Sequence, residues 1–186
     1  MEDFIMGDND KRIILALSPS RTYRENTLMM IKGIQKGNLR IILICVNQPA
    51  AFLMDFYQRN GIDTRRIFFI DAITQYAIGS PGESTDNCVF ISRPNNLTAI
   101  GIAVTTTLKK FEQEKTIIFL DSVNAMLIHS SSVDLLKFIH FIINKLRIMN
   151  IAGILLAIEK GLDPILLTQL TTFADETVEF PDEKAT

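Results

Sequence analysis

The chain has 186 residues, a length that fits one domain with a sizeable hydrophobic core. Hydrophobic residues make up 47% and the formal net charge is −2, so no basic field favours nucleic acid or an anionic membrane as a partner. No window approaches about 18 uninterrupted apolar residues, and the acidic start lacks the pattern of a signal peptide, so we expect a soluble, cytoplasmic protein.

Seven short runs of apolar residues indicate the strands. Six of them are continuously apolar, which is typical of strands covered on both faces in a parallel sheet. These six runs cover residues 12–18, 40–46, 66–71, 88–92, 116–122 and 153–159. A weaker, alternating run at residues 176–180 predicts an edge strand. Cys45 and Cys88 fall inside two of the apolar runs, so we expect buried thiols and no disulfide.

The segments between the first strands carry helix signals. Residues 24–36 predict a helix that ends at Gly37, which we expect in the left-handed conformation of a C-cap. Pro49 marks the first turn of the next helix, which we expect to stop at Asn60 and Gly61.

Two later helices are predicted by their capping residues and periodicity. Asn95 or Asn96 caps a helix over residues 97–110. A second helix covers residues 132–149, and its polar residues form one narrow stripe: Asp134, Lys137, His140, Asn144 and Arg147. The other sides of this helix are apolar, so we expect both the sheet and a further surface, such as a second subunit, to cover it.

Strands that alternate with helices predict a doubly wound α/β fold. We expect a single domain over residues 1–186 with its core at about residues 11–180. The only stretch rich in glycine, serine and proline, residues 76–87, is interpreted as a mobile loop within that domain.

Polar residues follow several of the predicted strands. In an open α/β sheet the ligand crevice lies at the carboxyl ends of the strands, so these residues are the candidates for a site. They are Ser18–Thr22, Asn47, Gln48, Asp71, Asp121, Ser122 and Glu159. An aspartate that closes an apolar strand, as in "TIIFLDS", is the Walker B arrangement that holds Mg²⁺ directly or through water.

The chain resembles the RecA/KaiC-type P-loop ATPases, and more closely the archaeal KaiC-like proteins of unassigned function. The resemblance covers nearly the whole chain and rests on "VNQP", "GIDTRRIFFIDAIT", "RPNNLTAIGIA", "IIFLDSVNAMLIH", "FIHFIINKLRIMNIAGILLAIEKG" and "FADETVEF". It implies a RecA/KaiC-like, mostly parallel sheet with the Walker B strand beside the phosphate-loop strand. It also implies that Asp121 and Ser122 match the Walker B pattern, and that ring-like self-association is common among relatives.

The phosphate-loop position departs from this pattern. Such a loop needs glycines whose N–H groups wrap the phosphates and a lysine that neutralises them, but the chain has "SPSRTYREN" there. The degenerate loop comprises Ser18, Pro19, Ser20, Arg21, Thr22 and Tyr23. We expect it to form a closed turn in which Ser18, Ser20, Thr22 and Asn26 bond to nearby backbone N–H groups. Where active relatives carry a catalytic glutamate, the chain has Asn47 and Gln48, whose amides are poor bases.

Several residues admit two interpretations. Arg21 either replaces the lost lysine or is an exposed loop arginine. Tyr23 either stacks on a base or packs on the following helix. Asp121 either holds Mg²⁺ or caps a helix.

Two further sets of residues are also open to interpretation. Asp71 and Glu159 either join Asp121 in a carboxylate cluster or cap helices and face water. His129 and His140 lack acidic or cysteine neighbours at metal-ligand spacing, and we expect His140 to be solvated.

These features favour a non-catalytic RecA/KaiC-like module that acts by binding, as a regulatory or signalling protein. No cofactor is required in this interpretation, and Mg-ATP binds weakly at most. The expected partner is a second copy of the chain or a signalling protein, not nucleic acid or a membrane. The alternative is an ATP-binding protein or ATPase of the KaiC-like group that uses a non-standard phosphate loop.

Overall fold

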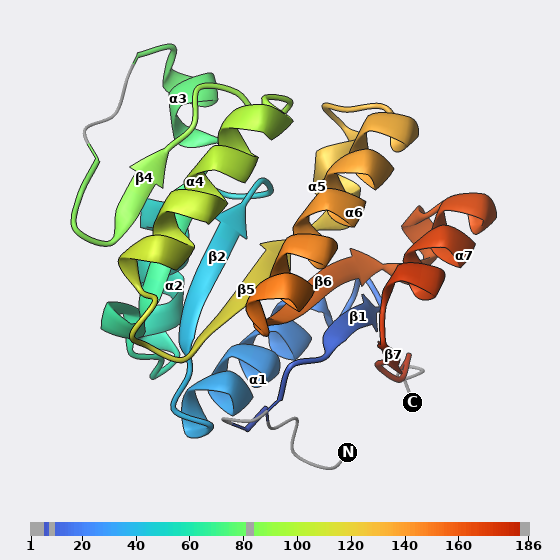
Figure 1. Cartoon of the computed structure of the whole chain (residues 1–186), viewed down its shortest axis with the longest axis horizontal. Helices are drawn as coiled ribbons and strands as arrows, with labels where there is room; N and C mark the ends of the chain where they lie inside the picture. Colours follow the sequence, from blue (N-terminus) through green and yellow to red (C-terminus); the bar gives the residue numbers. More distant parts are fainter. Residues whose placement is uncertain (1–5, 8–9, 81–83, 183–186) are drawn as a thin grey trace.

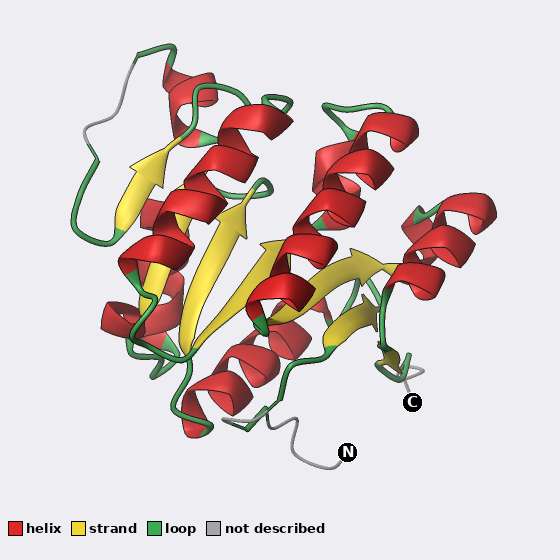
Figure 2. Ribbon diagram, viewed as in Figure 1, coloured by secondary structure: helices red, strands yellow, loops and turns green. Residues whose placement is uncertain are grey.

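The continuously apolar segments of the sequence become the strands of one parallel sheet (Figures 1 and 2). The computed structural model describes residues 6–7, 10–80 and 84–182. The strands within these residues are β1 (Ile13–Ser18), β2 (Arg40–Cys45), β3 (Ile67–Asp71), β4 (Cys88–Phe90), β5 (Thr116–Asp121), β6 (Ala152–Ile158) and β7 (Glu176–Glu179). The two cysteines lie in β2 and β4 as buried free thiols, as predicted.

Helices connect the strands. The α-helices are α1 (Tyr23–Lys36), α2 (Ala50–Arg59), α3 (Thr74–Ile78), α4 (Leu97–Lys110), α5 (Val123–Leu127), α6 (Ser132–Met149) and α7 (Pro164–Phe173). Two short 3₁₀ turns are η1 (Thr64–Arg66) and η2 (Glu159–Gly161). Among the described residues, none of these helices is long and apolar enough to cross a lipid bilayer.

The sheet is sandwiched between two layers of helices, which makes one α/β domain with the KaiC-like fold (Figure 1). Alternate residues of β1 point to opposite faces, so Ile13 packs in the core beneath α4, α6 and α7, while Ile14 packs in the core beneath α1 and α2. Both faces of the central strands are therefore buried, which explains why their sequences do not alternate.

The strand order is β4-β3-β2-β5-β6-β1-β7, with every pair of neighbours parallel. The expectation that the Walker B strand lies beside the phosphate-loop strand is wrong, because β6 pairs with both β1 and β5 and lies between them. A side chain from the phosphate-loop position must therefore reach across the end of β6 to contact the end of β5.

Two local predictions need correction. Gly37 is not left-handed, with φ of −76°; the left-handed residue is Asn38, with φ of 58°. A Cβ at Gly37 would lie 1.8 Å from the Met6 carbonyl oxygen, so the glycine is required by the close approach of another backbone segment. The predicted loop over residues 76–87 begins inside a helix, since α3 extends to Ile78, and its residues 81–83 lie outside the described part of the chain.

The predicted spans of the remaining helices are confirmed. Helix α2 follows Pro49 and ends before Asn60, and Gly61 is left-handed with φ of 75°. The Asn96 side chain caps α4 by accepting from the Ala99 N–H at 3.0 Å.

Candidate functional site

The phosphate-loop position is filled by its own side chains. Ser18 is buried at the end of β1, and Asn26, on the second turn of α1, donates from Nδ2 to the Ser18 hydroxyl at 2.9 Å and to the Thr22 hydroxyl at 3.1 Å. The Ser18 hydroxyl in turn donates to the Pro19 carbonyl at 3.1 Å. The turn is thus held by side chains as expected, but these bonds join the side chains to one another and to a carbonyl, whereas we predicted bonds to backbone N–H groups.

Tyr23 links the phosphate-loop position to the Walker B strand. Its hydroxyl donates a hydrogen bond to Oδ1 of Asp121, which is only 3% exposed. Burial raises the pKa of Asp121 to about 6, although the hydrogen bond from Tyr23 works in the opposite direction. Burial and the neighbouring Asp121 carboxylate raise the pKa of Tyr23 as well, so the phenol remains the proton donor. Neither of the two interpretations of Tyr23 anticipated this bond.

Asp121 does not cap a helix, because the cap of α5 is Ser122, whose hydroxyl accepts from the Ala125 N–H at 3.4 Å. The local donor set also does not fit Mg²⁺. That ion requires nearly octahedral oxygen coordination and usually keeps several waters, whereas one Asp121 oxygen is engaged by Tyr23 and the residue is almost fully covered. The Asp121 carboxylate is therefore engaged by a protein hydroxyl, that of Tyr23.

Asp71 has a structural role. This fully buried carboxylate accepts from the Ala50 N–H at 2.7 Å, from the N–H groups of Ile73 and Thr74 at 2.8 Å each, and from the Thr74 hydroxyl at 2.6 Å. It thereby satisfies the first N–H of α2, whose own N-cap is Pro49 without a side-chain cap bond. This confirms the helix-capping interpretation of Asp71.

Of the two interpretations of Asp71 and Glu159, the carboxylate cluster with Asp121 is not observed, and Glu159 is exposed on η2. No group of three or more potential metal ligands occurs among the residues that the structure describes. His140 is exposed and lies against the Phe173 ring at 5.3 Å between ring centroids, which confirms its solvated interpretation.

A cavity of about 420 Å³ opens between α1 and α2 beside the Tyr23–Asp121 pair. It collects several residues that we predicted for the site: Ser20, Arg21, Tyr23, Asn47, Gln48 and Asp121. Helix α2 adds Phe52, Phe56 and Tyr57, whose spacing follows the ordinary period of apolar residues in a helix and so carries no signal of a site.

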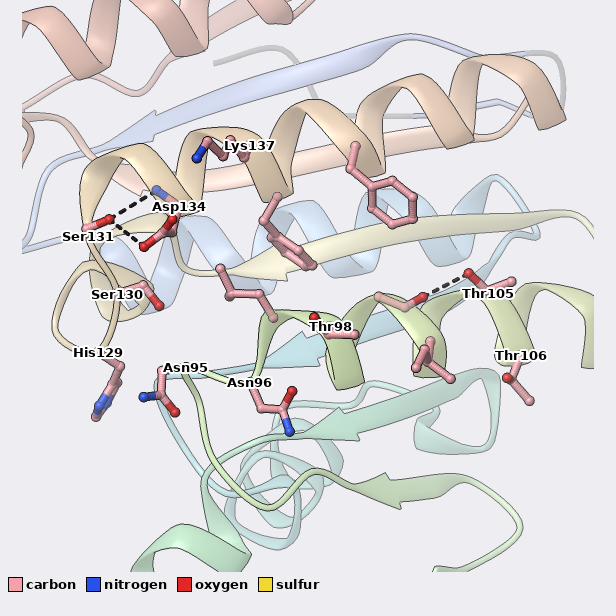
Figure 3. A pocket seen from close by; sticks show the side chains of 15 residues that line it. Asn95, Asn96, Thr98, Thr105, Thr106, His129, Ser130, Ser131, Asp134 and Lys137 are labelled. Atoms are coloured by element: carbon pink, nitrogen blue, oxygen red, sulfur yellow. Dashed lines mark hydrogen bonds between the residues drawn. The ribbon is translucent and has the colours of Figure 1, made fainter.

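A second and larger cavity of about 770 Å³ is a groove between α4 and α6 (Figure 3). Figure 3 shows Asn95, Asn96 and His129 gathered at one end of it, and Ser131 bonded to Asp134 at the start of α6. Its walls include Ile102 and Phe141, both exposed. The strand-end residues Asp121, Asn47 and Ser18 are not part of this groove.

The parallel sheet, with a phosphate-loop position after β1 and an aspartate at the end of β5, defines a protein with the KaiC-like fold of the RecA type. Within that class, the chain belongs to a family of unknown function, DUF7504, whose family model matches residues 14–180. Among curated proteins, none matches this sequence.

Three solved structures that are similar to this chain come from archaea. A KaiC-like protein from Pyrococcus horikoshii is 11% identical with a TM-score of 0.64, and the alignment covers 100% of this chain and 83% of the other. The flagellar accessory protein FlaH from Methanocaldococcus jannaschii is 13% identical with a TM-score of 0.59, covering 91% and 70%. An uncharacterised P. horikoshii protein in complex with an unknown peptide is 13% identical with a TM-score of 0.64, covering 91% and 77%. At such identities the similarity establishes the fold alone.

Proposed function

We propose that this protein is a non-catalytic RecA/KaiC-like module that acts by binding, in a regulatory or signalling role, and that it binds nucleotide weakly at most. The observation that carries the proposal is the hydrogen bond from Tyr23 to Asp121, which engages the Walker B carboxylate with a residue of the phosphate-loop position. The absence of glycine and lysine between Ser18 and Tyr23, and the amides Asn47 and Gln48 after β2, support it.

Electrostatics argue against tight ATP binding. Arg21 and Arg24 are the cations that line the cavity beside the loop, and both are exposed. Exposed ion pairs contribute about 0–1 kcal/mol each. Micromolar affinity requires roughly 8 kcal/mol. Two such contacts therefore supply far less binding free energy than micromolar affinity requires. A phosphate would also have to displace the hydrogen bonds among Ser18, Thr22 and Asn26.

We therefore expect no Mg-ATP binding tighter than about 1 mM by calorimetry, and no ATP or GTP hydrolysis above background. The matched variants are Arg21→Ala, at the loop, and Arg59→Ala, an exposed arginine at the end of α2 that does not line the cavity. A micromolar constant abolished by Arg21→Ala but not by Arg59→Ala would favour the alternative of an ATP-binding protein with a non-standard loop. A turnover that vanishes in Asp121→Ala would establish an ATPase.

The outer face of α6 supports self-association as the mode of binding. Val133, Phe141 and Ile148 are all exposed on it, Ile148 at 82%. Ile102 of α4, also exposed, lies across the same groove as Phe141. Exposed apolar side chains that gather on one face are typical of a protein–protein contact.

We expect light scattering to give a mass above that of the 21.0 kDa monomer at micromolar concentration. Phe141→Glu combined with Ile148→Glu should restore the monomer, because burying two carboxylates in an apolar contact is strongly unfavourable. Ile78→Glu, at an exposed residue of α3, is the matched control and should leave the mass unchanged. A monomeric wild-type protein would shift the proposal toward a separate signalling partner.

A further inference from the structure

The cavity between α1 and α2 has the size of a small-molecule site. Its volume of about 420 Å³ falls within the range of about 300–1,000 Å³ that is usual for such sites. Apolar side chains from α2 form one wall, and the amides of Asn47 and Gln48 lie at the start of that wall. The cavity is thus apolar and aromatic on the α2 side, and polar or charged side chains make up most of the rest of its lining.

Tyr57 supplies a buried polar group without a partner. The side chain is 0% exposed and lines the cavity, yet its hydroxyl has no hydrogen-bond partner among the described residues. Burial raises the pKa of Tyr57, and the nearby Asp121, Cys45 and Tyr23 raise it further. An unpaired buried hydroxyl is unfavourable, so this group is expected to meet a hydrogen-bonding atom in some state of the protein.

The apolar wall is aromatic. Phe52 and Phe56 are nearly parallel, with an interplanar angle of 8° and ring centroids 6.4 Å apart. Phe52 remains 47% exposed, so the wall is not covered by the rest of the domain. Flat ring faces of this kind favour stacking with another planar ring.

The cavity also carries two arginines. Arg21 and Arg24 line it, and Arg24 forms no ion pair within the described ranges. The hydrogen bond and charge of Lys160 lower the pKa of Asp182, and the charge of Arg21 lowers it slightly further. The guanidinium group binds a carboxylate through two parallel hydrogen bonds. Asp121 would repel an anion at the buried side. The α1 side also carries Glu25, but there the two arginines outnumber the carboxylate, so an acidic group belongs beside the arginines.

From these contacts we infer that the cavity binds a planar aromatic carboxylic acid. The ring lies against Phe52 and Phe56, the carboxylate is held by Arg21 and Arg24, and a polar substituent on the far side of the ring meets the Tyr57 hydroxyl. This inference goes beyond the proposed function, which requires no small ligand.

The test uses 6-hydroxy-2-naphthoate, with calorimetry and saturation-transfer NMR on the full chain. For a ligand of this size we expect a dissociation constant below about 1 mM. Phe52→Ala and Arg24→Ala should each raise it by at least about fivefold, since each removes one of the main contacts. The matched controls Tyr76→Ala and Arg59→Ala change an exposed tyrosine and an exposed arginine outside the cavity and should have no effect.

Tyr57→Phe separates a ligand contact from a merely structural role. This variant should raise the urea midpoint of the free protein, because an unpaired buried hydroxyl is removed. It should also weaken binding of 6-hydroxy-2-naphthoate about threefold to tenfold while leaving 2-naphthoate, which lacks the hydroxyl, unchanged. If Tyr57 had a merely structural role, the Tyr57→Phe protein would be less stable than the wild type. Its affinities for the two acids would then change by the same factor.

Four results would overturn the inference. The first is no binding of the acid up to about 5 mM, and the second is an equal loss of affinity for the acid in the site variants and in the control variants. The third is an equal affinity for the neutral amide of the same ring, and the fourth is tighter binding of AMP at the same residues. The last result would identify a nucleotide site. Tight ATP binding through Arg21 that leaves the naphthoate results intact would contradict only the proposed function.

Discussion

Replacing Asp71 with alanine should destabilise the protein by about 3–5 kcal/mol, the largest effect that we expect from a single substitution outside the apolar core. The carboxylate accepts four hydrogen bonds, three of them from backbone N–H groups, and it is fully buried. The variant leaves the Ala50 N–H without its partner at the start of α2, and Ala50 is itself buried. Urea unfolding at pH 7, followed by circular dichroism, measures the difference.

The matched control for Asp71 is Asp163→Ala. Asp163 also accepts from backbone N–H groups, those of Ile165 and Leu166, but it is an exposed N-cap. Water can take the place of the Asp163 carboxylate as the hydrogen-bond acceptor, so the variant should lose only about 1 kcal/mol of stability. Equal losses in the two variants would show that burial of the Asp71 carboxylate adds nothing to ordinary helix capping.

Asp121→Asn should stabilise the protein at pH 8 by about 3 kcal/mol. Burial raises the pKa of Asp121 from the ordinary 3.8 to about 6 in the folded protein. Below pH 3.8 the Asp121 carboxyl is protonated in both the folded and the unfolded state, so its titration does not change the stability of the protein. Between these values the folded state binds more protons than the unfolded state, so the stability falls as the pH rises, and above pH 6 the whole loss is present. Asparagine remains neutral and can still accept from the Tyr23 hydroxyl.

The difference between Asp121→Asn and wild type should therefore be small near pH 4 and reach its full size above pH 6. Urea unfolding at pH 4, 5, 6, 7 and 8 measures this profile, and Asp86→Asn, at an exposed aspartate, is the control. A difference that does not change with pH would mean that Asp121 titrates normally. A stabilised variant would show that the chain retains a buried carboxylate at the expense of stability, which is typical of a site residue.

The sequence by itself determined the elements and the edge of the sheet at which the site lies. Apolar runs without alternation identified the parallel strands, because a strand that is covered on both faces cannot alternate. The span of α6 and the Asn96 cap of α4 followed from local signals that involve only neighbouring residues. Since carboxyl ends of parallel strands meet at one edge, Ser18, Asn47 and Asp121 could be placed together before any coordinates.

Only the tertiary structure decided which side chains meet at that edge. Tyr23 and Asp121 are 98 residues apart in the chain, and their contact depends on β6 lying between β1 and β5 and on the path of α1, which connects β1 to β2. The bond from the Ala50 N–H to Asp71, the unpaired hydroxyl of Tyr57 and the close approach of Met6 to Gly37 depend on the same packing. Periodicity reports which face of an element is buried, but not which distant residue lies against it, because that is decided by strand order and by the packing of helices across the sheet.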